Sequence, residues 1–166
     1  MKIIALFLVA MVLILAGQYA NLRMKKRIIS LRQLIVMIEN IDSHISFSRK
    51  TIGEIISNLI CGEKVKLKVM SELLKCDNGN FSDNWKNSVE NFSSEDCLNI
   101  DDKNILLSFG KSLGITDTKG QTSNCMLHKA MLEKQLNEAE EKLKEKEKVN
   151  TAVSFFLALS AVIIFC

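Results

Sequence analysis

Proline is absent from the 166 residues of this chain, and aromatic residues make up only 6 % of it. A chain without proline has no residue that breaks the interior of a helix. Leucine, isoleucine, lysine and glutamate occur throughout, and most of these residues are good helix formers. The composition therefore predicts an all-α protein.

Charge of one sign is not in strong excess. The body from Leu22 to Lys148 holds 21 of the 22 Lys and Arg residues and all 19 Asp and Glu residues, so its net charge is 21 − 19 = +2. Proteins that bind nucleic acid normally carry a concentrated basic surface. The balance predicts that this chain does not bind nucleic acid.

Patterns typical of enzymes and metal sites are also missing. The five cysteines are odd in number, widely spaced and without a CxxC pair, which favours reduced thiols over a disulfide framework. Cys125 and His128 share a helical face, but a zinc site usually needs four ligands. The sequence has no phosphate-loop, dinucleotide-binding or hydrolase motif. We therefore expect no enzymatic activity, no cofactor and no metal.

Long apolar runs stand at both ends of the chain, at Ile3–Ala16 and at Thr151–Cys166. As helices, the first run extended through Gly17–Ala20 reaches roughly 27 Å and the second roughly 24 Å, both slightly less than the ~30 Å hydrocarbon core of a bilayer. Basic residues follow the first run, Arg27 among them, and others precede the second, which places the part between them in the cytoplasm. We expect transmembrane segments at 1–21 and 149–166, with both termini outside and a cytosolic helical domain at 22–148.

Each apolar run has an alternative interpretation. The first could be a cleaved signal peptide, but Ala16-Gly17-Gln18 is a poor cleavage site and a basic cluster follows directly. The second could be a buried core helix, but it is apolar on every side rather than on one face. Retained membrane segments are the favoured interpretation of both runs.

Two segments of the body carry apolar residues at alternating spacings of three and four. This pattern predicts helices that pack along a continuous seam. Because both helices lead to the same side of the membrane, we expect an antiparallel hairpin of the first and last helices, with shorter helices packed across it. The first seam is Leu31, Leu34, Ile38, Ile41 and Ile45, and the second is Leu132, Leu136, Ala139 and Leu143.

Shorter helices are predicted between the two seams. Thr51 and Glu54 form a capping box before one of them, and apolar periodicity predicts another at 65–74. A third, from Ser82 to about Phe92, would bury Trp85, Val89 and Phe92. The acidic stretch 76–102 around it is either a solvated loop region or a face for a basic partner.

The stretch Leu113–Gln121, called the joint below, carries the densest set of local signals. Asp101 or Asp102 caps the helix before it, and Gly114 fits the left-handed position that ends that helix. Thr118 offers the next N-cap with Gln121 at the reciprocal position. The joint is either a purely structural pair of caps or a partner contact. The candidate site residues are Gly110, Leu113, Gly114, Thr116, Asp117 and Gln121.

The stretch Leu106–Gln121 resembles the signature of the stage III sporulation protein AB family. That signature is close to L-x-x-x-G-x-x-L-G-x-[ST]-D-x-x-x-Q, and the six candidate residues together with Leu106 match it. The apolar start, the basic patch, the long charged helix and the apolar tail also resemble the family over the whole chain. This chain departs from the family pattern in having no proline after its first cytosolic helix and no glycine in its final segment.

The resemblance implies a function. Members of the family belong to the channel complex between mother cell and forespore, and they are similar to the helical cytoplasmic domain of the type II secretion system protein F. It implies a non-enzymatic platform that binds the sporulation ATPase, stage III sporulation protein AA, and other membrane subunits, with the domain in the mother-cell cytoplasm. Membrane lipid is a further partner, and a homo-oligomer is left open.

Two other functions compete with this one. The chain could be a helical membrane scaffold that self-associates through its seams and has no part in secretion. It could also be a secreted enzyme after signal cleavage, which would require a processed N-terminus near Gln18.

Overall fold

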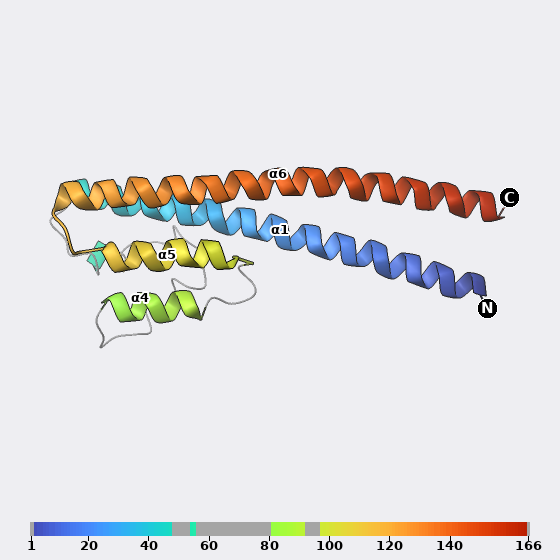
Figure 1. Cartoon of the computed structure of the whole chain (residues 1–166), viewed down its shortest axis with the longest axis horizontal. Helices are drawn as coiled ribbons and strands as arrows, with labels where there is room; N and C mark the ends of the chain where they lie inside the picture. The colour runs from blue at the N-terminus through green and yellow to red at the C-terminus, as the bar shows by residue number, and fades with distance from the viewer. Residues whose placement is uncertain (1, 48–53, 56–80, 92–96, 166) are drawn as a thin grey trace.

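The computed structural model describes the backbone of residues 2–47, 54–55, 81–91 and 97–165. Over these residues the regular structure is entirely helical, as the composition predicts. The expected helix at 65–74 and the Thr51 cap lie outside the described residues. The helices shown in Figure 1 are α1 (Lys2–Phe47), α4 (Phe81–Glu90), α5 (Ile100–Ser112) and α6 (Thr118–Phe165).

The first and last helices form the predicted antiparallel hairpin. α1 runs toward one end of the molecule, α6 returns from that end, and the two pack against each other. Both chain termini lie together at the opposite end (Figure 1). The end that carries the close of α1, the start of α6 and the joint is called the distal end below.

Both predicted seams are confirmed. Ile45, Leu136 and Leu143 are partly buried and pack against the core. Fixed heptad-like spacing places each seam on one stripe, which is why both stripes can be buried at once. The other seam residues have at most 1 % of their surface exposed, and they are Leu31, Leu34, Ile38, Ile41, Leu132 and Ala139.

Ion pairs across the hairpin follow the antiparallel register. Lys25 Nζ lies 2.8 Å from Glu147, nearer the termini. Arg32 lies 2.6 Å from Glu140, closer to the distal end. Such exposed pairs contribute little stability each. Their partners nevertheless move in opposite directions along the two helices, as an antiparallel pair requires.

The shorter helices stack on one side of the hairpin. α5 packs against α6, and α4 packs against α5 (Figure 1). The predicted helix of Trp85 begins one residue earlier than expected, at Phe81, and it buries Trp85 and Val89 as expected. Phe92, the third expected core residue, lies outside the described residues.

The two apolar ends continue α1 and α6 without a break. No helix in the part of the chain that the structure describes is long and apolar enough to cross a membrane. Most side chains of the segments 1–21 and 149–166 lie outside that description. The two transmembrane segments therefore stay predictions.

Candidate functional site

The joint begins where α5 ends, and its first residues turn the chain back toward α6. Leu113 leaves the helical conformation at φ −68° and ψ 130°, while its side chain stays buried in the core. Gly114 follows with φ 80°. Residues with a Cβ rarely adopt a positive φ, so the prediction that Gly114 takes the left-handed position is confirmed.

The start of α6 is capped by Asp117. The helix begins at Thr118, and Oδ1 of Asp117 accepts a hydrogen bond of 3.0 Å from the backbone N–H of Gly120. The prediction that Thr118 is the N-cap is therefore wrong by one residue. The side-chain oxygen that reaches the free N–H group three residues ahead belongs to Asp117, as in a standard N-cap.

Gln121 closes the joint from inside. Only 4 % of its surface is exposed. Its side-chain amide donates to Oγ1 of Thr116 at 3.0 Å and to the backbone carbonyl of Ser112 at 3.3 Å. These bonds connect the first turn of α6 to the last residue of α5, so the turn between the two helices has a fixed shape.

The six predicted residues therefore divide into two groups. Gly110, Leu113 and Gln121 are buried, whereas Gly114, Thr116 and Asp117 are exposed. The sequence analysis did not single out Ile115, although 75 % of its surface is exposed at the distal end. The sequence did contain a sign of this exposed residue. Ile115 is apolar but stands between a turn-forming glycine and the residues that cap α6, where no core position is expected.

Gly110 belongs to the contact between α4 and α5 rather than to the joint. A Cβ on Gly110 would lie 2.0 Å from Cδ1 of Trp85, so any larger residue would collide with the indole ring. The indole Nε1 donates a hydrogen bond of 2.8 Å to the carbonyl of Leu106, one turn earlier on α5. Trp85 also meets Phe109 edge-on at 5.9 Å between ring centroids.

A buried ion pair ties α1 and α5 together. The guanidinium of Arg27 donates two hydrogen bonds, of 2.8 and 2.9 Å, to the carboxylate of Asp102. The Asp102 side chain has no exposed surface. A further bond of 2.9 Å connects Arg27 to Gln135 on α6. The bond to Asp102 raises the pKa of Arg27 above its ordinary value, although burial acts in the opposite direction.

The cap of α5 also differs from the prediction. Asn99 is the N-cap, and its side chain and that of Asp102 bond to each other's backbone N–H in a capping box. The prediction of Asp101 or Asp102 as the cap is wrong by at least two residues. Asp102 instead joins the capping box to the ion pair with Arg27. Sequence reasoning assigned Arg27 to the basic patch beside the membrane and missed this contact.

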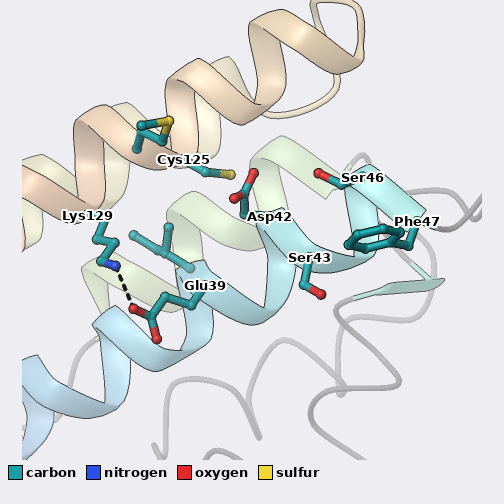
Figure 2. A pocket seen from close by; sticks show the side chains of 9 residues that line it. Glu39, Asp42, Ser43, Ser46, Phe47, Cys125 and Lys129 are labelled. Atoms are coloured by element: carbon teal, nitrogen blue, oxygen red, sulfur yellow. Dashed lines mark ion pairs between the residues drawn. The ribbon is translucent and has the colours of Figure 1, made fainter.

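A hollow of about 310 Å³ opens between α1 and α6 near the distal end (Figure 2). Lys129 Nζ lies at its edge, 2.6 Å from a carboxylate oxygen of Glu39. Phe47, with 90 % of its surface exposed, and Met126 supply apolar surface. Asp42 and Cys125 face each other across the two helices.

The described residues contain no group of three or more His, Cys, Asp and Glu side chains arranged to hold a metal ion. The His128 ring is tilted against that of Phe109, with 5.4 Å between centroids, and its Nδ1 lies 2.9 Å from the carbonyl of Asn124. Burial, and next the charge of Asp42, raise the pKa of Cys125 to about 12. A neutral, buried thiol is a poor ligand and a poor nucleophile.

The geometry therefore consists of a helical hairpin, two short helices and a rigid exposed joint. Comparison with curated proteins and with solved structures gives no significant match. The family model described as stage III sporulation protein AB (spore_III_AB) matches residues 2–166, which confirms the resemblance seen at Leu106–Gln121. The chain belongs to the stage III sporulation protein AB family, and its role is accordingly in sporulation.

Proposed function

We propose that this protein is a non-enzymatic membrane platform of the channel complex between mother cell and forespore. In this role it binds a cytosolic ATPase, stage III sporulation protein AA, and couples it to the membrane subunits. Family membership supplies the sporulation role. The proposal adds two functions to this role: attachment to the membrane at one end of the helical hairpin and binding of a partner at the other. The shape of the hairpin supports each of them.

The end that carries the termini supports membrane attachment. α1 and α6 extend as arms over residues 2–21 and 149–165, which are about 30 Å and about 26 Å long. The apolar side chains described on these arms are 48–69 % exposed, and they include Leu15, Tyr19, Val153 and Phe156. Exposed apolar surface on this scale requires a cover. A bilayer would cover both arms at once, because they leave the hairpin at the same end.

The distal end supports partner binding. It is the farthest part of the hairpin from both arms (Figure 1), so a protein in the cytoplasm could reach it. Ile115 carries the proposal, because it holds an apolar side chain 75 % exposed in a loop of fixed shape. A rigid apolar anchor loses little conformational entropy when a partner covers it.

The test measures binding of the purified ATPase to the full chain in lipid nanodiscs. Ile115→Ser should weaken binding by roughly 10- to 100-fold, because a buried isoleucine side chain at an interface contributes roughly 1.5–3 kcal/mol. Ile100→Ser is the matched control, since Ile100 is 76 % exposed at the other end of α5. It should leave binding unchanged.

Neither variant should shift the melting temperature, because both side chains are exposed in the free protein. Failure of the wild-type chain to bind the ATPase would refute the coupling role. Equal losses in the two variants would show that Ile115 is not the contact.

One observation favours self-association as a second candidate function. Leu22, Ile29 and Val36 are spaced by seven residues on α1 and are 45–58 % exposed, on the side away from the seam. A heptad-spaced apolar stripe is typical of helices that pair. Ile29→Glu with Val36→Glu should abolish any concentration-dependent oligomer of the full chain in analytical ultracentrifugation. A monomeric wild-type chain would exclude this function.

A further inference from the structure

The hollow between α1 and α6 has an unpaired acid in its wall. Oδ1 of Asp42 is buried and accepts no hydrogen bond from the described residues. Figure 2 shows the Asp42 carboxylate directed toward α6, next to Cys125. A buried acceptor without a donor costs free energy. The rest of the Asp42 side chain is partly exposed and lines the hollow, so a second molecule bound there could donate to the carboxylate.

Among the residues that the structure describes, no neighbouring group supplies a positive charge to Asp42. The ammonium group of Lys129 lies 2.6 Å from Glu39 and 3.7 Å from Glu133, so two other carboxylates hold it. Cys125 stays a neutral thiol because its pKa is raised. The described lining of the hollow therefore has one more carboxylate than ammonium groups, and the Asp42 carboxylate can still form a charge-assisted hydrogen bond.

The remaining wall of the hollow combines apolar side chains with the hydroxyls of Ser43 and Ser46. Phe47 is 90 % exposed and Met126 is 65 % exposed, and Ile38 lines the hollow between the helices. An arginine side chain matches this combination, because its carbon stem packs on apolar surface while its guanidinium stacks on an aromatic ring. The planar guanidinium can also donate to a carboxylate in a fixed geometry.

We propose that this hollow binds an arginine side chain, flanked by apolar residues, on a polypeptide segment of the ATPase partner. The guanidinium donates to Asp42 and lies against the Phe47 ring. The proposal rests on the platform function above and extends the binding surface from the joint to the hollow, both at the distal end.

The first test uses a short probe peptide and no ATPase. The fluorescent peptide acetyl-Ala-Leu-Arg-Leu-Ala-amide is titrated onto the full chain in lipid nanodiscs, beside a copy in which citrulline replaces arginine. Citrulline has nearly the same shape without the charge. The arginine peptide should bind about tenfold more tightly, since a hydrogen bond to a charged group is stronger than a neutral one. Asp42→Asn should remove this preference, and Asp101→Asn, an exposed acid on α5, should keep it.

Phe47→Ala should weaken binding of both peptides, because both lose the same apolar surface. Unchanged melting temperatures would show that the variants remain folded. Equal affinity for the two peptides, or a preference that persists in Asp42→Asn, would overturn the proposal. A chain that dimerises through Asp42 would also overturn it, because the occupant would then be a second copy.

The second test measures ATPase binding to Asp42→Asn. A decrease of about tenfold in affinity, with the fold of the variant intact, supports the assignment of the arginine to the ATPase. Unchanged binding overturns that assignment and leaves the platform function in place. Absence of ATPase binding by the wild-type chain overturns both the platform function and the occupant, even where the peptide binds.

Discussion

Arg27 has a structural role that its position in the sequence does not indicate. Arg27 stands among basic residues beside an apolar run, yet its guanidinium meets a carboxylate with no exposed surface. Removal of the arginine would leave that carboxylate buried and unpaired, which is more costly than never having buried a pair.

Arg27→Met should therefore lower the free energy of unfolding by about 3–5 kcal/mol. Arg32→Met is the control, because Arg32 pairs with Glu140 at a site where its own side chain is 63 % exposed, and its loss should cost at most about 1 kcal/mol. Denaturant unfolding of the full chain in mild detergent measures both. Equal costs would contradict the assigned role. The pKa of Arg27 is raised from a value that is already strongly basic. The stability that the ion pair gains from the charge of Arg27 is therefore present at neutral pH and would be lost only in strong alkali.

Cys125 offers a pH-dependent test at the residue scale. Its pKa is raised to about 12, chiefly by burial, so the fold favours the neutral thiol. Stability from this group is present below the pKa of the unfolded chain and is lost as pH rises toward 12. At pH 8.5 Cys125 should react with iodoacetamide at least about tenfold more slowly than the partly exposed Cys97, since the thiolate is the reactive form. Peptide mapping by mass spectrometry measures both rates, and similar rates in the folded chain would refute the assignment.

At the scale of elements, local side-chain chemistry determines roughly where each helix begins and ends. Several neighbouring residues are suited to the cap, so the cap expected from sequence differs from the observed one by one to three residues. Asp117, Thr118 and Gln121 all have side chains suited to an N-cap or its reciprocal position. Packing of Gln121 under the loop decides between them, because it holds Thr116 and Ser112 and thereby sets where α6 starts.

Asp117→Ala should lower the free energy of unfolding by about 1 kcal/mol, the usual cost of losing a capping side chain. Thr118→Ala should change it by no more than a few tenths of a kcal/mol, because Thr118 is the first helical residue and is exposed. Thermal unfolding of the two variants compares them. A larger loss of stability in Thr118→Ala than in Asp117→Ala would show that Thr118 is the N-cap, as expected from the sequence. A loss of ATPase binding in Asp117→Ala without a change in melting temperature would show a direct contact.

At the scale of the whole molecule, the hairpin places both apolar arms at one end and the joint at the other (Figure 1). The ion pairs and the two seams agree on the same antiparallel register. A membrane at the arms would therefore leave α4, α5 and the joint on a single side of it.

Epitope tags at the two termini should both be protected from protease in sealed vesicles whose cytoplasmic face points outward. The body between them should be digested under the same conditions, because the proposed topology places it on the cytoplasmic side of the bilayer. Detergent should expose both tags, which serves as the control. Cleavage of one tag alone in sealed vesicles would contradict the two-span topology.

The sequence by itself determined the class and the main pairing of this protein. Periodic apolar spacing specifies one buried stripe on each long helix, and Gly114 specifies the turn, because both follow from local backbone geometry. The tertiary structure alone decided that Arg27 meets Asp102, that Trp85 lies over Gly110 and that Asp42 faces Cys125 without a hydrogen-bond donor among the described residues. The residues of these three pairs are 75, 25 and 83 positions apart in the sequence. Their placement depends on how whole helices pack. No short-range pattern encodes that placement, because it results from the packing of all four described helices together.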